Sequence, residues 1–99
     1  MGSDAMGDEQ FREVLEQRHT FPGPYLFKIM GHPEDQFLER VLATVRTELK
    51  LSDEPEYQLK HTSTGRYVSI SVEPHVSTVD DVLSLYEVLG RVPGVKFLL

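Results

Sequence analysis

The stretch YLFKIMGHPEDQFLERVLATVRTELK, residues 25–50, changes from a strand pattern to a helix pattern across a short turn. Apolar side chains alternate over residues 25–30, which predicts a strand with one buried face. Over residues 34–50 the apolar positions recur at steps of one, three and four, which is typical of an amphipathic helix. The inward strand residues are then Tyr25, Phe27 and Ile29, and the helix stripe is Phe37, Leu38, Val41, Leu42, Val45 and Leu49. The stretch therefore predicts a strand–turn–helix unit.

A β-hairpin is expected next. Residues 57–62 form a weaker strand pattern, and RYVSISVE, residues 66–73, is a strong one because β-branched residues occupy alternate positions. The Ser-Thr-Gly turn between them suits a hairpin, since Gly65 adopts positive φ at little cost. The two patterns together predict the second and third strands of a sheet.

A second helix is expected after this hairpin. Ser77 or Thr78 can cap it, with Asp80 or Asp81 as the acid three residues on. Gly90 is expected to end it in the left-handed conformation. The helix stripe is then Val79, Val82, Leu83, Tyr86 and Leu89, and the inward residues of a last strand are Val95, Phe97 and Leu99.

Taken in order, these elements give β-α-β-β-α-β. Right-handed crossovers arrange them as an α+β ferredoxin-like sandwich, a four-stranded antiparallel sheet with two helices on one face. We expect the first and third strands to be central and to run parallel to each other. One domain over residues 21–99 accounts for the pattern, in keeping with a chain of 99 residues.

Two segments precede this domain. Residues 1–7, MGSDAMG, are expected to be a disordered or tag-derived start. Residues 8–20 are expected to hold a short helix capped by Asp8. Its apolar stripe would be Phe11, Val14 and Leu15.

Composition narrows the classes of function. The formal net charge is −6 at pH 7, and this sign repels phosphate backbones and argues against nucleic acid as a partner. There are no cysteines, which excludes disulfides, thiolate metal sites and a cysteine nucleophile. No apolar run is long enough to cross a bilayer, and no stretch reads as an export signal. We therefore expect a cytoplasmic protein with no membrane or nucleic-acid partner.

Three strings of the chain are similar to one known family. They are FPGPYLFKIMG (residues 21–31), GRYVSISVE (residues 65–73) and VDDVLSLYEVLGRVPGVKFLL (residues 79–99). They resemble the YbeD-like family of small, functionally uncharacterised bacterial proteins, whose fold is similar to that of ACT regulatory domains. The resemblance covers most of the chain from about Phe21 onward and implies a fold but no activity. ACT domains as a class bind amino acids or small metabolites and pair into dimers, which is a looser analogy.

The sheet face away from the helices is expected to be half polar and half apolar. An interface is predicted there, and its candidate residues are Leu26, Lys28, Met30, Tyr67 and Leu98. The N-terminal helix or a second subunit can cover such a face, and an ordinary solvated face is the alternative. Lys28 and Lys60, together with Glu73 and Arg66, can form cross-strand ion pairs, or the lysines can neutralise an acidic partner.

A ligand site is also predicted at one end of the sheet. The loops after the first and third strands are expected to emerge together, beside two helix N-termini whose free amides suit a carboxylate or phosphate. The candidate residues are Gly31, His32, Glu34, Glu73 and His75. A small anionic metabolite is the expected ligand of such a site. The alternative is an ordinary turn in which Gly31 permits the bend, Pro33 starts the helix and His32 is solvated.

Other kinds of site find little support. His32 and His75 could supply two metal ligands, but no spacing typical of a metal site occurs. An RNA-recognition sheet needs aromatic residues on its central strands, and Tyr67 is the one aromatic residue expected there. The acylphosphatases that share this element order need an asparagine, and the chain has none. We therefore expect no catalytic residues, no metal, no cofactor and no enzymatic activity.

These observations favour a regulatory or interaction domain with an ACT-like fold. It would act by pairing with itself as a homodimer or with a protein partner. The alternative is a sensor of small metabolites, either amino acids or anions, that binds them at the Gly31/His75 end of the sheet.

Overall fold

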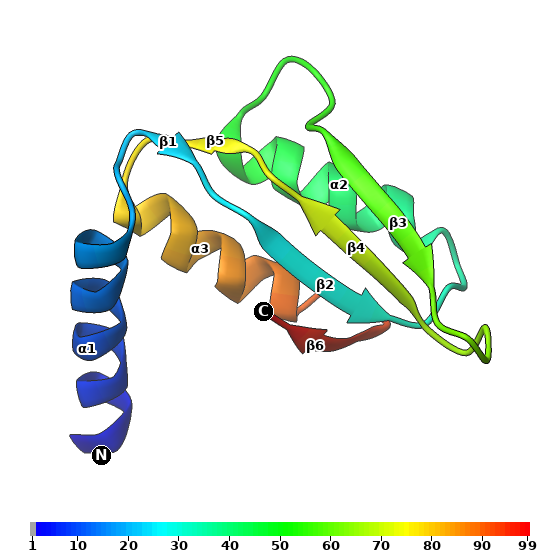
Figure 1. Cartoon of the computed structure of the whole chain (residues 1–99), viewed down its shortest axis with the longest axis horizontal. Coiled ribbons are helices and arrows are strands. Elements are labelled where there is room, and N and C mark those ends of the chain that lie inside the picture. The colour runs from blue at the N-terminus through cyan, green and yellow to red at the C-terminus, as the bar shows by residue number, and fades with distance from the viewer. Residues whose placement is uncertain (1) are drawn as a thin grey trace.

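The computed structural model describes residues 2–99, with side chains from Glu9 onward, and shows an α+β sandwich (Figure 1). Its helices are α1 (Gly2–Arg18), α2 (Phe37–Leu49) and α3 (Val79–Gly90). Its strands are β1 (Gly23–Pro24), β2 (Phe27–Gly31), β3 (Tyr57–His61), β4 (Val68–Val72), β5 (His75–Val76) and β6 (Val95–Leu98).

Strands β3, β4, β2 and β6 form one sheet in that order, and every neighbouring pair is antiparallel. Helices α2 and α3 both lie behind the same face of it (Figure 1). The ferredoxin-like prediction is therefore confirmed, with β2 and β4 in the centre. The expectation that these two strands run parallel is wrong. The crossover makes β2 and β3 parallel, and the hairpin then forces β4 to run against both.

The core lies between the sheet and the two helices. The inward side chains Phe27, Ile29 and Ile70 are fully buried, and so are Val41 and Val45 of α2. Burying each such side chain contributes about 1.5–3 kcal/mol. Among the described residues every buried side chain is hydrophobic, so the interior offers no polar site.

Helix α2 begins three residues later than predicted. Asp35 and Gln36 both adopt left-handed backbone conformations, with φ of 56° and 58°, before the first helical residue. This sharp turn brings the ring of Phe37 against Gly31 and Gly94. Glu34 and Asp35 therefore lie in the loop and not in the first helical turn.

Helix α3 begins at the predicted cap and ends differently. The Thr78 hydroxyl accepts a hydrogen bond from the Asp81 amide, and the Asp81 carboxylate accepts one from the Thr78 amide, which completes a capping box. Gly90 is the last helical residue and does not take the left-handed conformation expected of it. The chain instead leaves the helix through Arg91 in a right-handed conformation, and Gly94 takes the positive φ, 98°.

Helix α1 begins at Gly2, so Asp8 lies inside the helix and does not cap it. Leu15 is buried, with 2% of its surface exposed, and Arg12 forms an ion pair of 2.6 Å with Asp80 of α3. The N-terminal half of the helix projects away from the sheet and from the other two helices (Figure 1).

A short two-stranded ribbon, which the sequence pattern did not predict, extends one end of the sheet. Strand β1 pairs with β5, with Pro24 opposite His75, and the Tyr25 amide donates to the Pro74 carbonyl at 3.0 Å. The ribbon holds the segment that follows α1 next to the segment that precedes α3.

Candidate interaction surface on the open sheet face

The sheet face opposite α2 and α3 is the open face, and strand register arranges its side chains in three rows. From β3 across β4 to β2, the rows are Glu56–Glu73–Leu26, then Gln58–Ser71–Lys28, then Lys60–Ser69–Met30. The order across and along the sheet is thereby known for nine side chains.

The edge strand β6 adds two apolar side chains to this face, and they are not the ones predicted. A bulge between Met30 and Gly31 pairs Met30 with Phe97 and Gly31 with Val95, so Lys96 is an extra residue. The inward–outward alternation slips by one position as a result. Leu98 therefore packs against the core, and Phe97 and Leu99, predicted to point inward, lie exposed.

The half of the open face on β2 and β6 is mainly apolar, and its apolar column consists of Leu26, Met30, Phe97 and Leu99. Lys28 of β2 interrupts the column between Leu26 and Met30, opposite Leu99. The exposed fractions are 45% for Leu26, 60% for Phe97 and 74% for Leu99. Phe97 and Leu99 of β6 and Met30 beside Phe97 form the continuous part of this column, which is more informative than scattered single residues.

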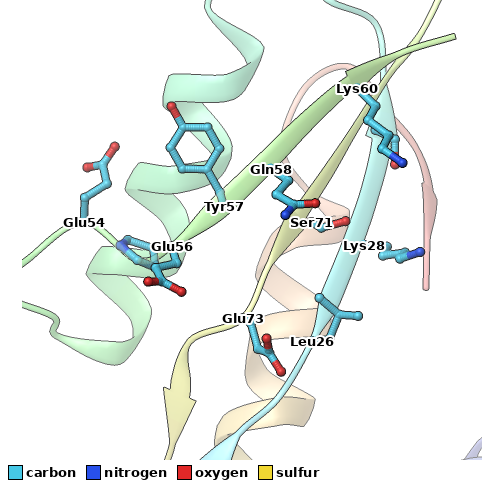
Figure 2. Close-up of a pocket in the computed structure, with 11 residues that line it drawn as sticks. Leu26, Lys28, Glu54, Glu56, Tyr57, Gln58, Lys60, Ser71 and Glu73 are labelled. Carbon is cyan, nitrogen blue, oxygen red and sulfur yellow. The ribbon is translucent and has the colours of Figure 1, made fainter.

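The half of the open face on β3 and β4 is polar and carries its charges at separate levels. Glu56 and Glu73 form an acidic row, Lys60 lies two rows away, and Lys28 of the neighbouring strand β2 lies in the row between them, as Figure 2 shows. The predicted cross-strand ion pairs do not form, because Glu73 lies in the row of Leu26 and Glu56. Among the described side chains, neither lysine has an ion-pair partner.

The open face is hollowed by a concavity of about 870 Å³. Its lining combines hydroxyl, amide and charged groups with one exposed leucine (Figure 2). The residues along it are Leu26, Lys28, Glu54, Pro55, Glu56, Tyr57, Gln58, Lys60, Ser69, Ser71 and Glu73. A wide, shallow hollow of this kind suits contact with a protein surface better than enclosure of a small ligand.

The predicted anion site is not assembled. Gly31 pairs with Val68 at one end of the sheet, whereas Phe27 pairs with Val72 at the other end, next to Glu73. Four residues of β2 separate the two ends by roughly 13 Å. His32 and Glu34 therefore lie at one end and Glu73 and His75 at the opposite end. The expectation that these loops meet is wrong because β2 and β4 are antiparallel.

Glycine is required at position 31 for a steric reason. Any side chain at this position would overlap the Gly94 carbonyl oxygen and the Phe37 ring, and the His32 amide donates to that same carbonyl at 3.0 Å. The His32 ring lies 5.2 Å from the Tyr67 ring, centre to centre. This end of the sheet is thus a packed turn and not a site. The alternative was right in that respect only, because Pro33 does not start α2 and His32 is partly covered by Tyr67.

The separation also breaks up the predicted pair of metal ligands, since His32 and His75 lie at opposite ends. No three histidine or acidic side chains lie close enough together to hold a metal ion within the described residues. None of the helices in that same part of the chain is long and apolar enough to span a membrane.

One tyrosine pair, which the sequence did not reveal, joins the segment between β1 and β2 to α3. The hydroxyl oxygens of Tyr25 and Tyr86 lie 3.2 Å apart. Burial raises the pKa of Tyr86 far above its ordinary value, and the hydrogen bond with Tyr25 raises this pKa further. The rings of Phe11 and Phe27 pack around Tyr86 at 5.8 and 5.0 Å.

Comparison with protein families gives a match over residues 16–99 to the model "Protein of unknown function (DUF493)". The chain belongs to this family. Among its relatives are a UPF0250 protein of Vibrio cholerae serotype O1, 30% identical over 93% of this chain and 94% of its own length, and a UPF0250 protein of Yersinia enterocolitica, 33% identical over 91% and 97%. The resemblance to the YbeD-like family is thereby confirmed.

Among solved structures, the chain is similar to the ACT domain from GTP pyrophosphokinase of Chlorobium tepidum. The TM-score is 0.58 over 78% of this chain and 95% of the other, at 12% sequence identity. The fold of this DUF493 chain is therefore ACT-like, and at this identity the likeness extends to the fold alone.

Proposed function

We propose that this chain is a non-enzymatic interaction domain that binds a protein surface through its open face. The partner is a second copy of the chain or another protein. Through such contact the domain would serve a regulatory role, as the ACT-like fold suggests by analogy.

The observation that carries the proposal is the apolar column beside the unpaired lysines. Phe97 and Leu99 are 60% and 74% exposed, although each has a residue of β2 beside it and a buried core behind the sheet. Water contact with this much apolar surface is unfavourable at about 25 cal/mol for each Å². A partner that covers the column would recover that free energy, and the polar half beside it would supply specificity.

The hydrophobic interior supports the non-enzymatic part of the proposal. Every buried side chain in the described part of the chain is hydrophobic, and the two neighbouring carboxylates of the open face, Glu56 and Glu73, are exposed to solvent and do not lie in an apolar pocket. The serines of this face, Ser69 and Ser71, lie next to amide and amine side chains. A contact surface therefore accounts for the face more simply than a reaction centre does.

The test compares two charge-introducing variants at exposed apolar positions. Phe97→Asp alters the open face, and the matched control Val14→Asp alters an exposed apolar position on α1, where Val14 is 48% exposed. Each protein is examined by light scattering over a concentration series and as bait for proteins from a bacterial extract. Phe97→Asp should abolish association that the wild type and Val14→Asp retain. Equal behaviour of both variants, or no association of the wild type in either assay, would refute the proposal.

The sensor alternative depended on Gly31 and His75 lying together at one end of the sheet. Since the register places them at opposite ends, that site does not exist and we do not propose it.

A further inference from the structure

We propose that two copies of the chain pack open face to open face, about a two-fold axis that crosses the strands at the level of Ser71. This inference rests on the proposed function and names the partner as a second copy. It follows from the order of charges along the face and from the division of the face into a polar and an apolar half.

The charges of the open face are separated along the strand direction. The acidic row with Glu56 lies on one side of the Gln58–Ser71–Lys28 row, and Lys60 lies on the other side. Glu56 directly precedes β3 and Lys60 lies within it, and both are exposed. The polar half of the face is therefore negative at one end and positive at the other, as Figure 2 shows.

A two-fold axis across the strands uses this separation. Rotation about it reverses the order of the rows and leaves each strand opposite its own copy. Glu56 then faces Lys60 of the partner subunit, and Lys60 faces Glu56 of the partner subunit. Lys28, in the middle row, faces its own copy across the axis, and Glu73 of the partner subunit lies one row and one strand away from it. Such an interface is isologous, because each contact occurs twice.

The same rotation matches the apolar halves. Leu26 comes to lie opposite Met30 of the partner subunit, and Phe97 and Leu99 border the same strip. The other in-plane axis, along the strands, would lay this column over the polar half formed by β3 and β4. Two sheets whose strands are nearly aligned pack well face to face, so the first arrangement is compatible with sheet twist.

Charge reversal tests the arrangement because the two partner positions are on one chain. Lys60→Glu places two pairs of like charges in the interface, and Glu56→Lys does the same with opposite sign. Each single variant should raise the dimer dissociation constant about tenfold or more. The double variant Lys60→Glu/Glu56→Lys exchanges both charges and should restore the wild-type constant.

The matched control is Arg66→Glu, which changes the net charge by the same amount as Lys60→Glu at an exposed hairpin position outside the three rows. It should leave the dissociation constant within about twofold of the wild type, since exposed charges away from a contact have little effect. Circular dichroism of each variant shows whether its fold is retained, and all three substituted side chains are exposed.

The outcomes separate this inference from the proposed function. A wild-type protein that stays monomeric up to millimolar concentration refutes the second copy, while capture of another protein that Phe97→Asp abolishes would still support an interaction domain. A dimer whose affinity the double variant does not restore refutes this arrangement of the two faces. The arrangement is also refuted if Lys60→Glu weakens the dimer no more than Arg66→Glu does.

Discussion

At the scale of single residues, Tyr86 has the most unusual surroundings. Its hydroxyl lies between the sheet and α3, 3.2 Å from the Tyr25 hydroxyl, with the Phe27 ring packed against its own. A phenolate there would lose its hydration, so burial favours the neutral phenol and raises its pKa. The neutral hydroxyl pair therefore helps to hold α3 against the segment between β1 and β2.

Replacing Tyr86 by Phe should change both the stability and its pH dependence. At neutral pH the lost hydrogen bond should lower the free energy of unfolding by about 0.5–1.5 kcal/mol. Because the folded-state pKa lies above the unfolded value of about 10, the folded state holds its proton longer. The stability due to the neutral phenol is thus complete below about pH 10 and declines as pH rises beyond it.

Urea unfolding of the wild type and Tyr86→Phe, from neutral pH to above pH 10, measures this difference. The variant should lose less stability than the wild type over the alkaline part of the range. Tyr57→Phe is the matched control, since Tyr57 is 43% exposed, and it should follow the wild type. Parallel pH curves for the wild type and Tyr86→Phe would show that the buried phenol does not contribute.

Predictability at this scale depends on whether a residue's role is local. Thr78 and Asp81 were predictable because a capping box is formed within four consecutive residues. The exchange of Phe97 and Leu98 was not, because the bulge at Lys96 arises from pairing with a strand more than sixty residues away. The exposed aromatic residue that carries the proposed function was missed for this reason.

At the scale of secondary-structure elements, α1 is attached to the domain by few contacts. Of the side chains described in α1, from Glu9 onward, Leu15 is the buried one and attaches this part of the helix to the core, while the Phe11 ring packs against Tyr86. The ion pair between Arg12 and Asp80 lies at the surface, and such pairs contribute about 0–1 kcal/mol. Burial of Leu15 should therefore dominate the docking of α1.

Leu15→Ala should lower the free energy of unfolding by about 2–5 kcal/mol, because it leaves a cavity in a packed core. Val14→Ala, the neighbouring change at a position 48% exposed, should stay within about 0.5 kcal/mol of the wild type. Urea unfolding of the three proteins compares them directly. If the two variants were equally stable, α1 would not be docked on the domain in solution.

Long elements with a regular pattern were predictable, and short or irregular ones were not. The apolar stripe of α2 and the apolar alternation of β4 predicted these two elements, since each element buries one continuous face. The two-residue strands β1 and β5 are too short to show any period. The late start of α2 follows from the left-handed backbone conformation of Asp35 and Gln36. Both are ordinary polar residues, so the sequence does not indicate this conformation.

At the scale of the whole molecule, strand direction decides which loops meet. The order of elements alone implies an antiparallel pair of central strands, because a crossover and a hairpin lie between them. The predicted anion site failed on this point and not for lack of sequence information. Leu26, Lys28 and Met30, by contrast, lie on the open face as predicted, since alternation along one strand decides their side.

The separation of the two sheet ends can be tested in solution through the His32 imidazole. Its ring lies 5.2 Å from the Tyr67 ring, so the aromatic field of Tyr67 should shift the NMR signals of its ring protons. Tyr67→Leu, which keeps an apolar side chain of moderate size, should move those signals markedly. His75→Ala should leave them in place, because Val68 and Val72 mark opposite ends of β4 and His75 follows the far one. A shift of the His32 signals in His75→Ala as large as that in Tyr67→Leu would mean that the loops after β2 and β4 meet after all, and the antiparallel register would then be wrong.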